Sequence, residues 1–334
     1  MNEKQIKQLA KEGFFGFEPI NGTLEQTHIS WVILSNKHAF KIKKPVKLSF
    51  LDFSTLTNRK KLCNRELLLN KRFSSIYESV APVRYGNNYW KIGDGVEKIV
   101  DYAVVMKRLD PAKRMDKLLI KNKVPESSVV ALAKDIARFH LNAPIIRSSF
   151  ISSDASSTFN DILSISGFVS DYLGKKFAGV IDNSIEWSGR MLCEHKQRIE
   201  DRISLGFRRD VHGDLHAGNI FAYKRPVIFD CIEFNDSYRQ IDVLSEIAFL
   251  CMDFESFKKL HLAETFLAVY KSTFDCLQQE DYILFNYYKC LRANIRAKVH
   301  AINCGQAKTK EAARFHLERL KIYLVLMEGY INLY

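Results

Sequence analysis

The chain has 334 residues, and its 50 Lys and Arg side chains outnumber its 38 Asp and Glu side chains, so the formal charge is +12. An apolar fraction of 47% with only 7 Pro and 15 Gly excludes disordered and collagen-like classes. No apolar run approaches the ~18 residues of a membrane-spanning helix, and the start of the chain is too charged for a signal peptide. The seven cysteines are scattered along the sequence, which is typical of a reducing compartment. These features predict a cytoplasmic protein without membrane insertion.

The first hundred residues are predicted to form mainly strands. Their β-rich runs are separated by turn residues and cover 29–34, 39–43, 80–85, 89–92 and 100–106. One helix is expected among them at 54–73, with Ser54 as its N-cap. Residues 1–109 carry 19 basic and 10 acidic side chains, a balance of +9, and such a segment attracts phosphate-bearing partners.

Beyond residue 110 the pattern changes to long helices. They are expected at 127–141, 159–173, 186–203, 282–301 and 312–326, and residues 148–157 are expected to form a polar loop. These patterns predict an α+β protein of two domains. The first is a small β-rich lobe at 1–109 with one main helix, and the second is a larger helical lobe at 110–334.

The most informative segment is VHGDLHAGNIFAYKRPVIFDCIEF, at 211–234. Strand-like runs at 220–222 and 227–229 predict a hairpin. If these runs pair across the four-residue turn YKRP, Asn219 lies opposite Asp230 at the open end of the hairpin. An amide oxygen and a carboxylate are therefore expected side by side.

Asp214 lies on a glycine-flanked loop that leads into the same end of the hairpin. Oxygen ligands that converge in this way suit Mg²⁺, which binds one or two protein oxygens together with phosphates and water. A carboxylate beside such a metal can orient a hydroxyl group and accept its proton during phosphoryl transfer.

HGDLHAGN at 212–219, followed eleven residues later by the Asp of IFD, resembles the Brenner motif of aminoglycoside phosphotransferases and choline-kinase-like enzymes, which are relatives of the protein kinases. The segment at 27–59 is similar to the start of a bacterial group of this family, in which the kinase half is often followed by a P-loop ATPase domain. The resemblance covers nearly the whole chain. It implies a bilobal protein-kinase-like fold that uses ATP and Mg²⁺.

The resemblance assigns roles to individual residues around the hairpin. It implies that Asp214 is the catalytic base and that Asn219 and Asp230 are metal ligands. It also implies that Asp242, which begins the next predicted helix, braces the catalytic loop.

The amino-terminal lobe of such an enzyme supplies a lysine for the phosphates and a glutamate that holds it. Lys41 fits the family position, and Lys43, two residues later on the same strand face, is the alternative. Glu66 lies on the apolar face of its predicted helix, where a carboxylate needs a cationic partner that a strand lysine can supply. Pairing of Glu66 with Arg59 or Arg65 is the other possibility.

The chain departs from the family pattern before this lysine, because EQTHIS at 25–30 stands where a G-x-G-x-x-G loop is expected. We expect the phosphates to be capped instead by side chains and amides of Thr27, His28 and Ser30. Between the lobes, the resemblance implies that the backbone of a hinge including Met106 and Arg108 meets adenine.

Three further patterns receive ordinary interpretations. His212 and His216 lie on a loop without an evident third ligand, so zinc binding is not expected. His140 lies on an apolar helix face and is expected to be a core histidine. The spacing from Gly167 to Lys175 does not fit a P-loop, so no ATPase half is expected in this chain. An ATPase that acts together with this protein could be encoded separately.

Lys289, Arg292, Arg296 and His300 form a basic stripe on a predicted late helix. A solvated helix face is the ordinary interpretation. Binding of an anionic group is the alternative, because helices in this part of the resembling fold shape the acceptor pocket.

These features together predict an ATP- and Mg²⁺-dependent phosphotransferase that moves the γ-phosphate of the nucleotide to a hydroxyl of a small molecule. A charge of +12 favours a neutral or anionic acceptor over a polycationic aminoglycoside. One alternative is a protein Ser/Thr kinase, although no APE motif follows Asp230. The other is a non-catalytic nucleotide-sensing or nucleic-acid-binding module, which the intact set of Asp214, Asn219 and Asp230 disfavours, so a nucleic-acid partner is not expected.

Overall fold

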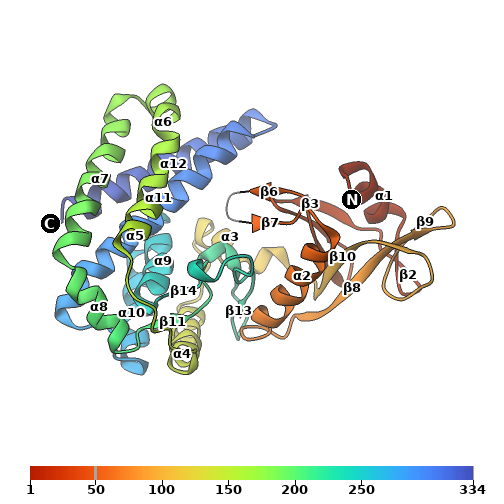
Figure 1. Cartoon of the computed structure of the whole chain (residues 1–334), viewed down its shortest axis with the longest axis horizontal. Helices are drawn as coiled ribbons and strands as arrows, with labels where there is room; N and C mark the ends of the chain where they lie inside the picture. Colours follow the sequence, from red (N-terminus) through yellow and green to blue (C-terminus); the bar gives the residue numbers. More distant parts are fainter. Residues whose placement is uncertain (49–50, 334) are drawn as a thin grey trace. The chain divides into compact units, whose positions relative to one another are not determined.

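The computed structural model describes residues 1–48 and 51–333, and the chain forms two compact units (Figure 1). The N-terminal unit contains Met1–Arg114, Asn219–Tyr223 and Val227–Tyr238. The helical unit contains Met115–Gly218, Lys224–Pro226 and the chain from Arg239 onwards. A β-rich first unit and a helical second unit confirm the predicted α+β class. The assignment of 1–109 and 110–334 as functional domains stays a prediction.

An eight-stranded sheet dominates the N-terminal unit, in the order β2-β1-β9-β8-β10-β5-β4-β3. Its strands are β1 (Phe14–Phe15), β2 (Glu18–Pro19), β3 (Thr23–Gln26), β4 (Ser30–Leu34), β5 (His38–Lys43), β8 (Tyr77–Gly86), β9 (Tyr89–Ile92) and β10 (Lys98–Lys107). The helices are α1 (Glu3–Glu12), α2 (Leu56–Asn70) and 3-10 turns at Pro111–Lys113 and Asp236–Tyr238. Two small hairpins pair β6 (Lys47–Leu48) with β7 (Leu51–Asp52) and β12 (Ile220–Phe221) with β13 (Val227–Ile228).

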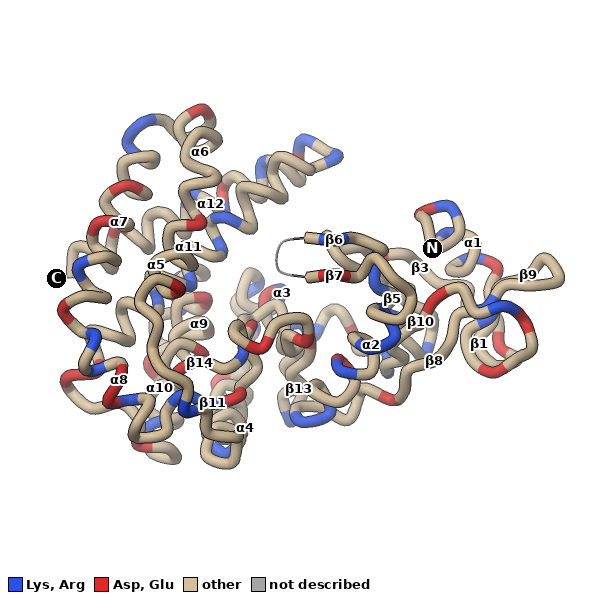
Figure 2. The backbone as a smooth tube through the Cα atoms, in the orientation of Figure 1, with Lys and Arg blue, Asp and Glu red and all other residues tan. Residues whose placement is uncertain are grey.

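Strand β5 positions side chains on both faces of this sheet. Phe40 and Ile42 pack in the apolar cluster that includes α1, whereas Ala39 packs in the cluster that includes α2. Because successive side chains of a strand point to opposite faces, Lys41 and Lys43 share the face of Ala39. Basic residues gather along β5, β6 and α2 (Figure 2). The sheet thus presents two lysines to the α2 side.

The N-cap of helix α2 lies one residue later than predicted, and the helix covers Leu56–Asn70 rather than 54–73. Its N-cap is Thr55, whose hydroxyl accepts a hydrogen bond from the Asn58 amide (3.1 Å). Ser54 is not the cap, because both its amide and its hydroxyl donate to the Asp52 carboxylate. Both Ser and Thr are good caps, so the competing partner at Asp52 decides between them.

The helical unit consists of α3 (Met115–Ile120), α4 (Glu126–Asn142), α5 (Ser152–Asn160), α6 (Ser166–Leu173), α7 (Lys175–Glu194), α8 (Lys196–Ser204), α9 (Val243–Ser256), α10 (Leu260–Thr273), α11 (Tyr282–Gly305) and α12 (Lys310–Ile331). Short 3-10 helices occupy Asp161–Ile165 and Gln279–Asp281. A third 3-10 helix, at Ala217–Asn219, includes the point where the chain leaves the helical unit and enters the N-terminal unit. Strand β11 (Arg208–Asp210) pairs with β14 (Gln240–Asp242). Nearly every residue of α9 is buried, and α11 packs against both α9 and α12. Ionisable groups on α9 must therefore find partners inside the unit.

The structure corrects three predictions about this unit. The expected loop at 148–157 is largely helix α5, because burial of Phe159 in the core outweighs the low helix propensity of its serines. The expected helix at 159–173 is divided between the end of α5, a 3-10 turn and α6, whose C-cap is Gly174 with a positive φ of 88° that favours glycine. The expected helix at 186–203 is broken at His195. Among the helices at 1–48 and 51–333, none is both long enough and apolar enough to cross a membrane.

Candidate functional site

The predicted lysine and glutamate meet on the α2 face of the sheet. Lys41 Nζ lies 2.8 Å from Glu66 Oε1, and Lys43 Nζ lies 2.7 Å from Glu66 Oε2. Glu66 is fully buried, as its position on the apolar face of α2 predicts. Arg59 pairs instead with Asp101 and Arg65 with Asp236, so the alternative partners predicted for Glu66 are wrong, and both candidate lysines contact it.

Two more carboxylates extend this cluster. Lys41 Nζ lies 2.5 Å from Asp230 Oδ1, and Lys43 Nζ contacts Glu233. Asp230 is 41% exposed, whereas the Glu233 side chain is almost fully buried. The five side chains form a continuous series, Asp230–Lys41–Glu66–Lys43–Glu233, which we call the charge network. With three carboxylates and two ammonium groups it has a net charge of −1 when all are ionised.

The electrostatics of the charge network are set by burial and by mutual attraction. Burial alone would raise the pKa of Glu66, but the ammonium groups of Lys41 and Lys43 outweigh it and lower that pKa to about 2. For Glu233, burial dominates and the nearby Glu66 adds to it, so the pKa of Glu233 is raised despite Lys43. Burial opposes the charge of Lys41, yet Asp230 and Glu66 raise its pKa well above the usual value.

Helix α2 also holds the backbone that carries Asp230. The Cys231 amide donates to Asn70 Oδ1 (2.8 Å), and Asn70 Nδ2 donates to the Cys231 carbonyl (3.5 Å). The Asp230 amide donates to the Tyr77 hydroxyl (3.0 Å), and Arg65 forms an ion pair with Asp236. The segment that follows β13 is therefore anchored at several points within the N-terminal unit.

The register of the β12–β13 hairpin differs from the prediction by one residue. Phe221 pairs with Val227, so Phe229 lies opposite Asn219 and its amide donates to the Asn219 carbonyl (3.1 Å). The prediction placed Asp230 there. The shift arises because the Ala222 amide donates to the Lys113 carbonyl (2.8 Å), which removes Ala222 from the ladder and lengthens the turn.

Asp230 follows this paired stretch with φ 67°, in the left-handed region that Asp tolerates better than most residues. Its Oδ2 receives no hydrogen bond from residues 1–48 and 51–333. The buried Asn219 lies at the other strand of the same hairpin end. The proposed metal ligands thus share one hairpin end, although not as a directly opposed pair.

The segment expected to cap the phosphates is organised by its own side chains. Thr27 Oγ1 accepts a hydrogen bond from the Ser30 amide (3.0 Å), and the Thr27 amide donates to the Ser30 carbonyl (2.9 Å). Ser30 is buried and His28 is exposed. These contacts fix the turn between β3 and β4, while its role toward phosphate stays a prediction.

The proposed hinge residues lie at the end of β10. Met106 is buried in the cluster beneath α2, and its backbone pairs with Ala39 of β5. Arg108 donates a side-chain hydrogen bond to the Ser35 carbonyl and its amide donates to the Lys37 carbonyl. Contact of either residue with adenine stays a prediction.

In the helical unit, the backbone of the loop at 211–217 is fixed by buried side chains. The amides of His212 and Gly213 donate to the Glu246 carboxylate at 2.9 and 2.6 Å. The Gly213 carbonyl accepts from Arg292 Nη1 (3.2 Å), and the Ala217 amide donates to Asp253 Oδ2 (2.8 Å). Helices α9 and α11 therefore hold the loop that carries Asp214 at three points.

Glu246, rather than the predicted Asp242, binds the amides of this loop. Asp242 caps α9 through the Leu244 amide (2.8 Å) and forms a bidentate ion pair with the fully buried Arg202 (2.7 and 2.9 Å). The core histidine expected at His140 is confirmed, because it is buried between Glu246 and the Tyr270 hydroxyl.

Asp214 lies on this fixed loop with its side chain 37% exposed, and Oδ2 lies 3.5 Å from His216 Nε2. Desolvation favours the neutral acid, but the charges of His216 and Arg296 outweigh it, so the pKa of Asp214 lies below its usual range. Asp214 is therefore an ionised carboxylate at neutral pH.

The basic stripe on α11 is not a solvated face. Arg292 and His300 are buried, and Lys289 pairs with Glu255 (3.0 Å). Arg292 donates to Ser245 as well as to Gly213. The prediction failed because helical spacing shows that four basic residues share a face, but not which neighbours cover that face.

His300 gives a pH-dependent stability that can be measured. Burial, Arg296 and Arg319 lower its pKa to about 2, with His316 and His216 adding to the effect. An unfolded histidine titrates near pH ~6.5, so the unfolded chain binds a proton below that pH while folded His300 stays neutral. Stability is thus full above pH ~6.5 and falls as the pH decreases, by about 1.4 kcal/mol at pH ~5.5.

Replacement of His300 by Asn should remove this pH dependence. Urea unfolding of the wild type at pH ~7.5 and ~5.5 should show the loss, and the variant should show a smaller difference between the two pH values. An unchanged difference in the variant would assign the acid sensitivity to other groups.

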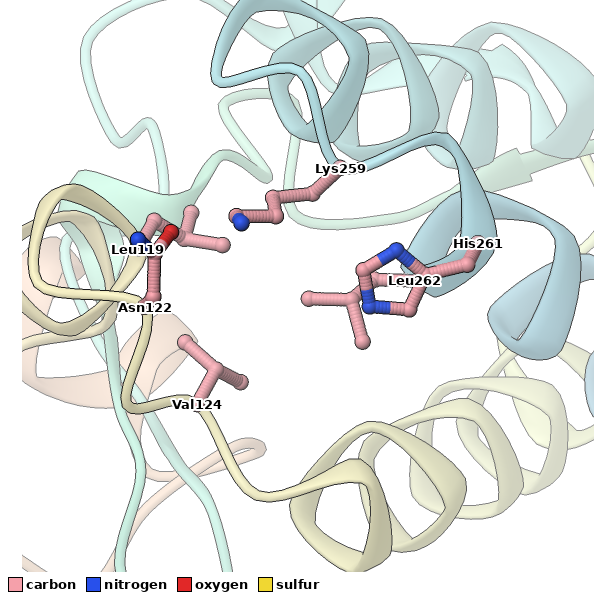
Figure 3. Close-up of a pocket in the computed structure, with 6 residues that line it drawn as sticks. All are labelled: Leu119, Asn122, Val124, Lys259, His261 and Leu262. Carbon is pink, nitrogen blue, oxygen red and sulfur yellow. The ribbon is translucent and has the colours of Figure 1, made fainter.

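The helical unit also contains a small pocket lined by Leu119, Asn122, Val124, Lys259, His261 and Leu262 (Figure 3). Lys259 reaches toward Leu119 and Asn122 across it (Figure 3). Its volume of about 50 Å³ suits water rather than a nucleotide, since ligand pockets usually have ~300 Å³ or more. In the part of the chain that the structure describes, no group of three or more His, Cys, Asp or Glu side chains could hold a metal ion.

Comparison with known proteins places this geometry in context. Uncharacterized proteins of Mycobacterium bovis and Mycobacterium tuberculosis are 28% identical over 317 residues, which is 92% of this chain. The chain spans 62% of the length of these curated relatives. No family model matches the chain.

Among solved structures, choline kinase from Cryptosporidium parvum Iowa II has a TM-score of 0.54 at 14% identity, over 99% of this chain and 96% of that one. An amicoumacin kinase in complex with AMP-PNP, Ca²⁺ and Ami has a TM-score of 0.52 at 12% identity, over 97% and 94%. The chain has the fold of these kinases. The predicted likeness to choline-kinase-like proteins and the predicted kinase-like fold are thus confirmed at the level of the fold.

Proposed function

We propose that this chain is a small-molecule kinase, which transfers the γ-phosphate of ATP to a hydroxyl group. The observation that carries the proposal is the position of Lys41, which contacts both Glu66 and Asp230, although 189 residues separate Lys41 from Asp230. A fold hosts many activities, so the kinase-like fold supports the proposal without deciding it. The similar solved structures are named as choline and amicoumacin kinases, which agrees with a small acceptor.

In this proposal the N-terminal unit binds the nucleotide. Lys41 contacts the phosphates and Glu66 holds its ammonium group in place, because a buried carboxylate fixes a flexible lysine side chain. The turn of Thr27, His28 and Ser30 lies over the phosphates, and the backbone at Met106 and Arg108 meets adenine.

A divalent cation fits the side chains at the end of the β12–β13 hairpin. Asp230 is partly exposed and already contacts a cation, the Lys41 ammonium group, through one oxygen only. Carboxylate and amide oxygens are ligands that Mg²⁺ prefers, so Asp230 and Asn219 are the side chains that would hold it. When bound there, Mg²⁺ neutralises negative charge on the nucleotide phosphates.

Asp214 orients the acceptor hydroxyl and receives its proton. The hydroxyl oxygen forms a bond to the γ-phosphorus while the bond from that phosphorus to the bridging oxygen breaks, so that ADP leaves with the electron pair and the proton passes through Asp214 to solvent. Asp214 and Asn219 are five positions apart, so their Cα atoms lie within about 18 Å of each other in any conformation. Both residues belong to the single motif HGDLHAGN at 212–219.

The purified protein should consume ATP in the presence of Mg²⁺ and one or more members of a metabolite library. We expect Lys41→Met to weaken ATP binding by about 10-fold or more, since it removes a charged contact with phosphate. Lys37→Met is the matched control, because Lys37 is exposed and its ion pair is with the exposed Glu18. Displacement of a fluorescent nucleotide by ATP measures both variants. Equal ATP affinities in the two variants would contradict the nucleotide site.

A further inference from the structure

Helices α11 and α12 bring a group of nitrogen-bearing side chains together. Arg296 Nη2 lies 3.4 Å from His300 Nε2, and His300 Nδ1 lies 2.9 Å from His316 Nδ1. We call Arg296, His300 and His316 the Arg–His cluster. The His300 ring stacks on the Tyr323 ring with centroids 5.5 Å apart, which fixes the orientation of the imidazole.

Two charged groups beside the cluster, Asp253 and Arg292, already have hydrogen-bond partners of their own. Asp253 accepts from the Ala217 amide and the Tyr323 hydroxyl and lies 3.9 Å from Arg319. Arg292 uses its donors on backbone and hydroxyl oxygens. No carboxylate lies within ion-pair distance of Arg296 among residues 1–48 and 51–333.

Arg296 retains capacity to donate. Its Nε is buried and has no hydrogen-bond partner in the described part of the chain, and its guanidinium lies 5.9 Å from the Tyr323 ring centroid. A guanidinium has five N–H donors in a fork that matches phosphate or carboxylate. An unsatisfied buried donor costs free energy, which binding of an acceptor atom would recover.

The position of Arg296 connects the cluster with the loop that carries Asp214. Arg292 lies one turn earlier on α11, about 6 Å along the axis, and donates directly to the Gly213 carbonyl. The charge of Arg296 acts on Asp214, and that of His216 acts on His300. The low pKa of His300 follows from burial together with surrounding Arg and His side chains, which indicates a positive potential within the cluster.

We propose that the Arg–His cluster is an acceptor subsite in which Arg296 binds a phosphate or carboxylate group of the small molecule that is phosphorylated. This inference rests on the proposed kinase activity and names the acceptor class: hydroxylated anions. Choline is positively charged, so it is poorly matched to a guanidinium. The anion on Arg296 fixes one end of the acceptor and leaves its hydroxyl for Asp214.

Binding of inorganic phosphate and of citrate tests the subsite directly. Titration calorimetry on the full chain, with AMP-PNP and Mg²⁺ at saturation to occupy the nucleotide site, should detect one anion site. We expect Arg296→Met to weaken it by about 10-fold to 100-fold and Arg296→Lys to weaken it less. Arg314→Met is the control, since Arg314 is 83% exposed and its ion pair is with Glu318 on the same helix surface. Circular dichroism verifies that each variant is folded.

Matched acceptors then test the substrate class. ATP consumption should be faster with glycerol 3-phosphate and other hydroxylated phosphates or carboxylates than with glycerol or choline, and Arg296→Met should remove this preference. Failure to bind ATP at all would overturn the kinase proposal. ATP consumption with glycerol or choline equal to that with the anions, or anion affinity unchanged in both Arg296 variants, would overturn only the anionic subsite.

Discussion

Replacement of Asp214 by Asn is expected to lower the rate of phosphate transfer by about 10²-fold to 10⁴-fold, while ATP still binds with unchanged affinity. Asn has the shape of Asp but cannot accept a proton. The loop itself should persist, because its backbone is held by Glu246, Arg292 and Asp253 rather than by the Asp214 side chain. Initial rates under saturating ATP and fluorescent-nucleotide displacement measure the two effects separately.

Asp171→Asn provides the matched control, because it makes the same chemical change at an exposed site on α6. The pH dependence gives a second readout. Since the pKa of Asp214 lies below its usual range, this group should stay ionised between pH ~5 and ~9 and contribute no acidic limb to the wild-type rate profile there. A rate for Asp214→Asn close to that of Asp171→Asn would show that Asp214 has no part in proton transfer.

Local sequence pattern and the family resemblance together predict the ion pair at the centre of the charge network. Glu66 on an apolar helix face requires a buried cation, and alternation along β5 supplies Lys41 and Lys43 on one face. Pattern could not show that both lysines contact Glu66. Two strand residues separated by one position reach the same helical side chain only at a suitable angle and distance between strand and helix. Tertiary packing sets that angle and distance.

Glu233 and Glu246 were missed although each carries a signal in the sequence. Each lies within a strongly apolar run where a charge must be paired: Glu233 in IFDCIEF, which also holds Asp230, and Glu246 in LSEIAFL. The sequence does not identify the partner. Glu246 binds two loop amides and His140, and Glu233 binds Lys43. Such partners are 33 to 190 residues away, beyond the reach of any local periodicity.

Loss of one member of the charge network should cost far more stability than loss of two. Lys43→Met removes the ammonium group that the buried carboxylates of Glu66 and Glu233 share. The free energy of unfolding of the N-terminal unit is therefore expected to fall by about 3–5 kcal/mol. The double variant Lys43→Met/Glu233→Gln also removes the stranded carboxylate and should recover more than half of that loss. Glu66 would still be paired with Lys41.

Tryptophan fluorescence can follow this unit alone, since Trp31 and Trp90 belong to its core and Trp187 belongs to the helical unit. Urea unfolding in a Trp187→Phe background should therefore report the transition of the N-terminal unit. Lys7→Met, which removes an exposed ion pair on α1, should change its stability by less than about 0.5 kcal/mol. Equal losses in the single and double variants would mean that Lys43 and Glu233 are not coupled. Recovery in the double variant would show that Lys43 is retained to neutralise carboxylates, leaving Lys41 as the lysine available to the nucleotide.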